Sequence, residues 1–467
     1  MNESPRPLFR LDALRDVLRR VREQLPERLR PGKDVEAERL RAQVAVIRRA
    51  FREKGLLVLG APVEGAEPCR DDADIHFLYR PGHAVVREED LPRLREYFGR
   101  VDNVRRFRGG VKGRTTRVPG LVLAQLPQRL DGRDDVLATI EELERGQVVE
   151  RGAVGPDHVV YVTPRGYLCP ASEPEIPAVR RGGVWPPPAK DEHRGKVDPV
   201  RVAVVDTGLW TDAVTSPVTP WLSGVVADPS DVEVVDPDDI HPYAGHGTFA
   251  AGVIRCIAPG TRVEVEGVLT HGGAVFETEI VEQLHEAIND CDDPQVISIS
   301  AGTHTRGDFR SVAFEVLGRA NKLGDRDDVL IVAAAGNDAS DRPFWPAAFD
   351  WVVGVGSVDP DGSVSDFSNV GETWVDVYAR GRDVVNAFPR GTYRCYEPPN
   401  VGQVRTFDGL AQWSGTSFST PIVAGLVAAR MRETGETAHQ AWASVLSGAT
   451  DAIDPRGGQI KVVGPLT

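Results

Sequence analysis

The stretch Gly415-Thr416-Ser417-Phe418-Ser419-Thr420-Pro421 precedes an apolar run of small residues, 422–429, and places a serine at the start of a predicted helix. A serine hydroxyl is a poor nucleophile near neutral pH, so an imidazole must take its proton and a carboxylate must orient that imidazole. Val204-Val205-Asp206-Thr207-Gly208 supplies the carboxylate, and Gly245-His246-Gly247-Thr248 supplies the imidazole. These segments predict a nucleophile, Ser417, with His246 as general base and Asp206 as orienting acid.

Two apolar runs lead into polar residues in the way that buried parallel strands end. Val202-Ala203-Val204-Val205 ends at Asp206, and the run 329–335 ends at Gly336-Asn337. Attack on a carbonyl creates a negative oxygen that needs hydrogen-bond donors fixed in place beforehand. The side-chain amide of Asn337 is a candidate for that donor.

The order Asp, His, Ser, together with the asparagine motif, resembles the subtilase family of subtilisin-like serine proteases over roughly residues 198 to 455. The resemblance implies an α/β catalytic domain with a mostly parallel sheet flanked by helices. It implies a serine endopeptidase that forms an acyl-enzyme on Ser417, and Asn337 matches the family's oxyanion asparagine. In subtilisin, loss of that donor costs about a hundred- to a thousandfold in turnover.

The same resemblance implies where a protein or peptide substrate binds. The strand Val296-Ile297-Ser298-Ile299 ends at Ser300, Ala301 and Gly302, which match the family segment that pairs with the substrate backbone. Ala334, Ala335 and Gly336 match the other wall of the primary pocket. Because both walls carry small residues, we expect a roomy pocket.

Two other functions remain open at this stage. The acyl-enzyme is resolved by an amine instead of water in a peptide transpeptidase or macrocyclase, and the motifs do not separate these reactions. A non-catalytic binding scaffold is the alternative from another class, since each motif taken singly is also an ordinary turn or helix cap. The presence of all four motifs in order favours an enzyme.

A length of 467 residues with 41% hydrophobic content predicts more than one domain. Apolar residues at helical spacing predict two amphipathic helices, one with Leu11, Leu14, Leu18, Val21 and Leu25, and one with Leu40, Val44, Ile47 and Phe51. The expected domains are amphipathic helices at 1–60, a prosegment-like domain at 61–175, a Pro/Gly-rich linker at 176–197, and the peptidase domain at 198–467.

The second region has the element order of a small ferredoxin-like α+β domain. The patterns predict a strand at 74–79, a helix at 89–98, strands at 104–107 and 121–126, a helix at 136–143 and a strand at 159–162. Subtilase prosegments look like this, template the folding of the catalytic domain and occupy its cleft. We therefore expect a zymogen with an intramolecular inhibitor, cut near Arg180-Arg181 or closer to Cys169, with an adaptor or sensor module as the alternative.

Charge is unevenly divided along the chain. Residues 1–195 carry 36 Lys+Arg and 31 Asp+Glu, a net +5, and residues 196–467 carry 19 and 38, a net −19, which together give the total of −14. In the first part the arginines alternate with acids, a pattern typical of solvated helix faces, so no nucleic-acid partner is expected. The opposite signs predict a salt-sensitive clamp between the two parts.

The remaining features concern location and cofactors. The charged N-terminus and the lack of long apolar runs predict a cytoplasmic protein without membrane association. Five cysteines (Cys69, Cys169, Cys256, Cys291, Cys395) without paired spacing argue against a disulfide framework and a zinc site. No cofactor or metal is required, although the acidic segments 228–231 and 236–239 leave calcium possible but unknown.

Overall fold

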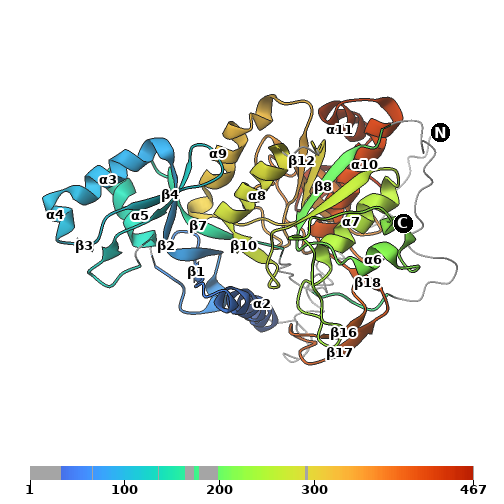
Figure 1. Cartoon of the computed structure of the whole chain (residues 1–467), viewed down its shortest axis with the longest axis horizontal. Coiled ribbons are helices and arrows are strands. Elements are labelled where there is room, and N and C mark those ends of the chain that lie inside the picture. The colour runs from blue at the N-terminus through green and yellow to red at the C-terminus, as the bar shows by residue number, and fades with distance from the viewer. Residues whose placement is uncertain are drawn as a thin grey trace, which may run out of the picture.

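The computed structural model describes residues 33–65, 67–134, 136–162, 173–177, 198–289 and 293–465. The predicted helix with Leu11 to Leu25, Cys169, Cys291 and Arg180-Arg181 lie outside these residues. The described chain forms two lobes, an N-terminal lobe of residues 33–162 and a C-terminal lobe of residues 198–465 (Figure 1).

The C-terminal lobe is built on an eight-stranded sheet with the order β19-β20-β14-β13-β12-β11-β8-β9. Its strands from β9 to β20 pair in parallel, and only β19 is antiparallel to its neighbour. The central strands are short apolar runs because a parallel sheet is covered on both faces. Their bounds are β8 Arg201–Asp206, β9 Arg262–Gly267, β11 Val296–Ile299, β12 Leu330–Ala334, β13 Val352–Val358, β14 Val377–Arg380, β19 Thr450–Asp454 and β20 Gly458–Val462.

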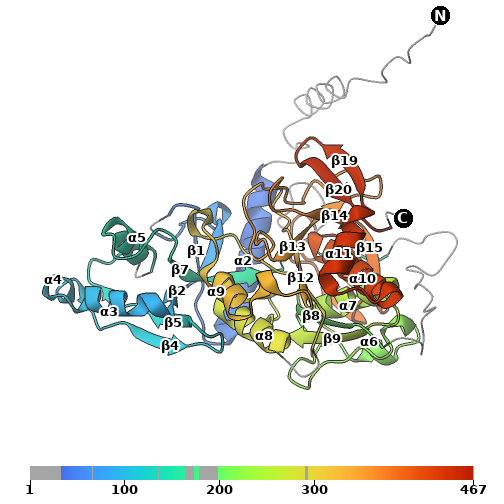
Figure 2. The same ribbon diagram turned by 90° about the horizontal axis from the view of Figure 1, so that it is seen from above.

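Helices cover both faces of this sheet, so the predicted α/β class is confirmed. Helices α7 (His246–Ile257) and α10 (Thr416–Thr434) pack together on one face, and α11 (Ala438–Ser447) packs on α10. Helices α8 (Glu277–Asn289) and α9 (Val312–Ala320) lie on the side that faces the N-terminal lobe (Figures 1 and 2). Two hairpin-like pairs and a short helix lie outside the main sheet: β15 Val384–Ala387 with β18 Leu410–Trp413, β16 Gly391–Arg394 with β17 Val404–Phe407, and α6 Asp212–Thr215.

The N-terminal lobe has an antiparallel sheet with the order β7-β2-β5-β4, crossed by α3 and α5, which is the ferredoxin-like arrangement. Strand β10 of the C-terminal lobe extends this sheet by pairing with β7. The elements are β1 Leu59–Ala61, β2 Phe77–Arg87, α3 Leu91–Gly99, α4 Val101–Val104, β3 Phe107–Arg108, β4 Lys112–Thr115, β5 Leu121–Gln125, β6 Gln128–Arg129, α5 Leu137–Arg145, β7 Val154–Tyr161 and β10 Ala274–Phe276.

One strand prediction in this lobe is wrong. Most of the predicted strand 104–107 is the end of a short helix and the turn after it, and the second strand of the domain is β4, Lys112–Thr115. All four residues of β4 are exposed and polar or glycine. An edge strand outside the core has no apolar alternation, so its sequence carries no strand signal.

The helix predicted from Leu40, Val44, Ile47 and Phe51 is confirmed as α2, Lys33–Glu53. These four side chains are buried in a cluster that also contains Phe276 of β10, and the rings of Phe51 and Phe276 lie 4.6 Å apart. Helix α2 therefore packs across the seam at which the two lobes share a sheet.

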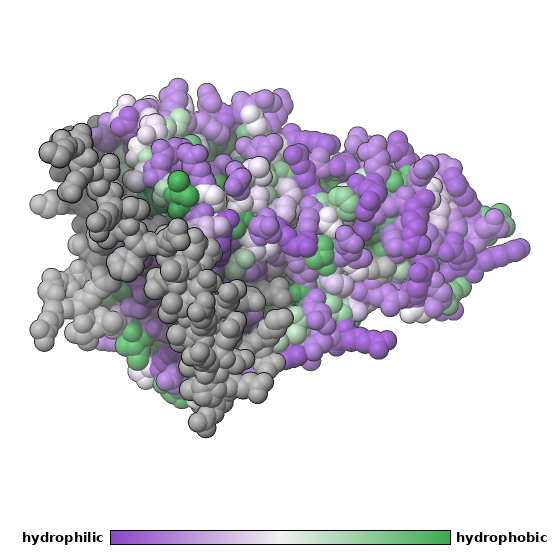
Figure 3. All heavy atoms as spheres, turned by 180° about the vertical axis from the view of Figure 1, so that it is seen from behind, coloured by the Kyte–Doolittle hydropathy of each residue, from purple (hydrophilic) through white to green (hydrophobic). Residues whose placement is uncertain are grey.

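Hydrophilic residues dominate the face of the molecule that is opposite the view of Figure 1. The face in Figure 3 is mostly hydrophilic, with small separate hydrophobic spots. Among the described residues, no helix combines the length and the hydropathy that crossing a membrane requires.

Candidate active site

The predicted aspartate and histidine lie together beyond the carboxyl ends of the parallel strands. Asp206 is the last residue of β8, and His246 is the first residue of α7. The Nδ1 atom of His246 lies 2.7 Å from Asp206 Oδ1, which also accepts a 2.7 Å hydrogen bond from the backbone N–H of Thr207. A carboxylate held in this way favours the imidazole tautomer with its proton on Nδ1, which leaves Nε2 free to act as a base.

A glycine at position 247 allows this approach. A Cβ atom on Gly247 would lie 2.7 Å from the carbonyl oxygen of Gly208 and 3.1 Å from the Cβ of Asp206. Any side chain at 247 would therefore push the start of α7 away from the end of β8. The Gly-His-Gly motif is thus a packing requirement for bringing His246 to Asp206.

Ser417 is the second residue of α10, at the same edge of the sheet. Pro421 lies inside this helix and has no N–H to donate to the Ser417 carbonyl four residues earlier. The hydroxyl of Ser300 donates to that carbonyl instead, at 2.8 Å. Ser300, which the sequence predicts to bind substrate, thus supports the backbone at Ser417.

The hydroxyl of Ser417 donates to the backbone oxygen of Ser300 at 3.3 Å, and among the described residues it forms no hydrogen bond with His246. Serine and base often form a well-aligned hydrogen bond only once substrate is bound. The rings of Trp413 and Phe418 pack against His246, with centroid distances of 5.4 and 5.3 Å. Asp206, His246 and Ser417 are all buried, so the site is shielded from water.

Asn337 follows β12, and its amide is oriented by the residue before Ser417. Its Oδ1 accepts hydrogen bonds from the backbone N–H and the hydroxyl of Thr416, at 2.8 and 3.0 Å. With the oxygen held by Thr416, the NH₂ group supplies the remaining donors of the amide, and a Cβ on Gly415, two residues before Ser417, would lie 3.5 Å from Asn337 Nδ2. This position matches that of a donor to an oxyanion beside Ser417. Thr416 stands in the sequence motif, but only the tertiary structure reveals its contact with Asn337.

A buried acid that sequence reasoning missed, Glu233, lies behind the histidine. Its carboxyl group accepts a 2.8 Å hydrogen bond from the N–H of Gly245, directly before His246. Burial raises the pKa of Glu233 well above its ordinary value, and the hydrogen bond from Gly245 opposes that rise. Glu233 thus anchors the residue at which α7 begins, and the charge of Asp206 adds to the rise in its pKa.

The expected roomy pocket is narrowed by Phe344. The predicted walls end at Gly302 on one side and Gly336 on the other, and the ring of Phe344 touches both. A Cβ on Gly302 would lie 2.3 Å from Phe344 Cε1, and a Cβ on Gly336 would lie 3.1 Å from Phe344 Cδ1. Phe344 is almost fully buried. The small wall residues therefore make room for an aromatic ring of the protein itself.

The end of β7 pairs with Gly302, which lies in the segment predicted to bind substrate. Tyr161 and Gly302 exchange two backbone hydrogen bonds, of 2.9 and 3.1 Å, in an antiparallel bridge. On the other side, Val162 donates to the carbonyl of Gly273 at 2.9 Å, and Ala274 pairs with Tyr161. Residues 161–162 thus form the middle strand between two segments of the C-terminal lobe.

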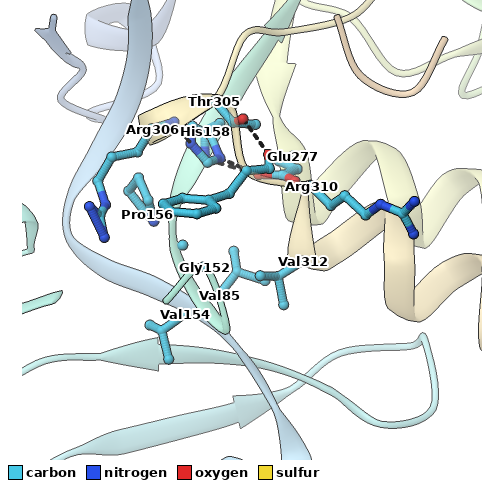
Figure 4. Close-up of a pocket in the computed structure, with 12 residues that line it drawn as sticks. Val85, Gly152, Val154, Pro156, His158, Glu277, Thr305, Arg306, Arg310 and Val312 are labelled. Atoms are coloured by element: carbon cyan, nitrogen blue, oxygen red, sulfur yellow. Dashed lines mark hydrogen bonds and ion pairs between the residues drawn. The ribbon is translucent and has the colours of Figure 1, made fainter. Parts of the chain in front are cut away.

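Buried polar residues join the lobes next to this strand. His158 of β7 points toward Glu277 at the start of α8, with Nδ1 and Oε2 2.7 Å apart (Figure 4). The neighbouring Asp157 accepts hydrogen bonds from the backbone and hydroxyl of Thr278, both at 3.1 Å. Burial, reinforced by the charge of Glu277, raises the pKa of Asp157 to about 7.

Arginines of the N-terminal lobe pair with acids on α8 and α9. Arg87 lies 2.6 Å from Glu315, and Arg114 lies 3.0 Å from Glu282. These ion pairs agree with the net positive charge of the first half of the chain and the net negative charge of the second.

Within the described parts of the chain, no group of three or more His, Cys, Asp or Glu side chains has the arrangement of a metal site. The acidic segments 228–231 and 236–239 lie among these residues, and calcium binding by them stays an expectation. Cys69, Cys256 and Cys395 are free thiols.

Comparison with known proteins gives the family. The family model described as "Subtilase family" matches residues 198–455, and this chain belongs to that family. A thermophilic serine proteinase of Bacillus sp. (strain AK1) is 31% identical over 239 residues, covering 49% of this chain and 51% of the relative. The chain therefore spans about half the length of that relative.

The chain is also similar to two further proteins. An intracellular serine protease of Paenibacillus polymyxa is 28% identical over 288 residues, covering 58% of this chain and 77% of the relative. The crystal structure of a cold-adapted subtilisin-like serine proteinase is 26% identical, covers 57% of this chain and 89% of that chain, and has a TM-score of 0.43.

Proposed function

We propose that this protein is a serine endopeptidase whose own N-terminal lobe occupies its substrate cleft. The single observation that carries the activity is the convergence of Asp206, His246, Asn337 and Ser417 at one edge of the sheet, with the 2.7 Å contact between His246 and Asp206. In the proposed reaction Ser417 Oγ attacks the scissile carbonyl, and His246 takes the hydroxyl proton and passes it to the leaving amine. Water then attacks the acyl-enzyme and releases Ser417. The reaction uses only side chains of this chain, and no cofactor enters it.

The residue before the scissile bond is proposed to be small. Ser300 to Gly302 and Ala334 to Gly336 form the walls of the primary pocket, and the ring of Phe344 fills the space between them. A methyl or hydroxymethyl group fits beside such a ring, whereas an aromatic or long aliphatic side chain requires the ring to move.

Autoinhibition is supported by the place of Tyr161. An extended substrate is expected to add a strand at Gly302, and Tyr161 already uses the N–H and the carbonyl of that residue. Helix α2, the shared sheet at β10 and the arginine pairs on α8 and α9 reinforce this position. A cytoplasmic location belongs to the same proposal, since a protease released inside a cell needs such a restraint.

Intact-mass spectrometry with a fluorophosphonate probe tests the activity. Wild-type protein should gain one probe mass, and Ser417→Ala should gain none. Ser419→Ala is the matched control, because Ser419 lies in the same helix and its hydroxyl bonds the backbone of Ala379. Labelling of Ser417→Ala, or none of the wild type after the lobes have been separated by protease or salt, would contradict the proposal.

The same spectra distinguish two forms of inhibition. A wild-type chain that is cut between residues 162 and 198, while Ser417→Ala stays whole, indicates an autoprocessed prosegment. An uncut chain that is still labelled indicates a permanent inhibitory domain. Transpeptidation would appear as a product about 18 Da lighter than the hydrolysed one, because the amine of the peptide replaces water.

A further inference from the structure

The segment 386–410, which precedes the nucleophile, carries a hairpin that the proposed chemistry does not use. Strands β16 and β17 form this hairpin, and residues 173–177 of the chain lie on it. The contact is specific: the Glu173 side chain is only 3% exposed, and its Oε1 accepts hydrogen bonds from the Tyr393 hydroxyl at 3.0 Å and the Tyr396 N–H at 2.8 Å.

Hydrogen-bond donors and a guanidinium surround the buried carboxyl group of Glu173. Burial raises the pKa of Glu173, and the hydrogen bonds from Tyr396 and Tyr393 oppose that rise. The guanidinium of Arg405 and the backbone N–H of Glu397 oppose it further. Arg405 itself donates to the Pro174 carbonyl at 2.6 Å. A buried carboxylate needs this number of donors to repay the loss of water. A glutamine whose oxygen takes the place of Oε1 loses the charge that Arg405 attracts and places an NH₂ group where Oε2 lies.

Glu175, two residues after Glu173, is held by hydrogen bonds of its backbone. Glu175 and Gln412 exchange two hydrogen bonds of 2.8 Å each, in an antiparallel bridge at the edge of β18. The Glu175 side chain is 35% exposed and lies 3.9 Å from Arg405, so it contributes little. Gln412 lies five residues before Ser417, and its neighbour Trp413 packs on His246.

The direction of the chain indicates on which side of the scissile bond Gln412 and the hairpin lie. The chain first pairs antiparallel with Gly302 at Tyr161 and later pairs antiparallel with Gln412 at Glu175. A substrate that binds in the same direction passes Gly302, then Ser417, then Gln412. Gln412 and the hairpin therefore meet residues that follow the scissile bond, on the leaving-group side.

We propose that the β16–β17 hairpin and the edge of β18 form a substrate subsite on the leaving-group side that selects a glutamate. The inference rests on the proposed endopeptidase activity and names part of its substrate: a peptide with a glutamate whose carboxylate meets Tyr393, Tyr396 and Arg405. The chain's own Glu173 occupies this subsite in the inhibited protein. Loss of one hydrogen bond to a charged group changes affinity by about tenfold to a hundredfold, which sets the expected selectivity.

The first experiment measures the subsite in the full chain without any need for activity. Hydrogen exchange of the Gln412 amide reports release of residues 173–175, because that N–H donates to Glu175. Glu173→Gln should speed this exchange by about tenfold or more. Glu175→Gln, the matched control, should change it by less than about threefold. Equal effects of the two variants would overturn the proposal.

The second experiment measures selection of substrate by full-length Glu173→Gln. The two peptides of each pair differ only by Glu or Gln at one position, and successive pairs move that position along the residues after the scissile bond. Both peptides of a pair compete in the same reaction, and the product masses give the ratio of their kcat/KM values. The tethered segment slows both peptides by the same factor, so the ratio is unaffected. One position should prefer Glu by about tenfold or more, and Tyr393→Phe should remove most of that preference.

The outcomes separate this inference from the proposed function. Ratios near one at every position, in protein whose Ser417 reacts with the probe, overturn the subsite and leave the protease in place. If Ser417 does not react, the proposed function fails and the substrate role fails with it, while the exchange experiment still decides whether the hairpin selects a carboxylate.

Discussion

If the proposed endopeptidase function holds, Phe344→Ala changes which residue is accepted before the scissile bond. The ring of Phe344 lies between Gly302 and Gly336, and it is 2% exposed. Removing it leaves a space of aromatic size between the two walls. Burial of an aromatic or large aliphatic substrate side chain in that space is worth about 1.5–3 kcal/mol. The ratio of kcat/KM for Phe over Ala should therefore rise by about tenfold to a hundredfold.

The assay compares two peptides that differ only in the residue before the scissile bond, Ala or Phe, in one tube with full-length protein. The tethered N-terminal lobe slows cleavage of both peptides by the same factor, so the ratio of their kcat/KM values is unaffected. Product masses give the ratio for wild type, Phe344→Leu and Phe344→Ala, and we expect a graded increase in that order.

Stability needs a matched control, because Phe to Ala in a core costs about 3–5 kcal/mol. Phe349→Ala removes another buried ring, one that packs on Trp345 with centroids 4.5 Å apart. It should lower the Tm in a similar way and leave the peptide ratio unchanged. A wild type that already prefers Phe, or a Phe344→Ala protein with the wild-type ratio, would refute the assignment of Phe344 to the pocket.

Three further results are expected. Asp206→Asn should slow labelling of Ser417 by about 10⁴-fold, because the wrong imidazole tautomer then faces the serine; labelling rates measure this, and an unchanged rate would remove Asp206 from the site. Rising ionic strength should speed labelling, because it screens the half-exposed Arg114–Glu282 pair and its neighbours; a rate independent of salt would contradict the clamp. The pKa of Asp157 rises from 3.8 to about 7 on burial, so the docked lobe binds more protons than the released lobe. Docking should therefore weaken as the pH rises from about 4 to about 7. Asp157→Asn should flatten that dependence in a pH series of Ser417 labelling, and an equally steep series would exclude Asp157 as its source.

The sequence by itself determined the chemistry of the candidate site. Asp206, His246, Asn337 and Ser417 each stand in a short motif with its own local reason, a strand end or a helix start, and the parallel sheet brings such ends to one edge. The sequence also predicted the buried face of α2, because amphipathic spacing is a local signal.

Tertiary structure alone decided which residues surround that chemistry. Phe344 closes a pocket whose walls are small, and Glu173 binds Tyr393 from 220 positions away. Strand β4 is exposed and polar, so only its pairing with β5 defines it. A motif reports the conformation of its own few residues, whereas specificity and inhibition depend on which distant side chains fill the same space, and no local pattern records that.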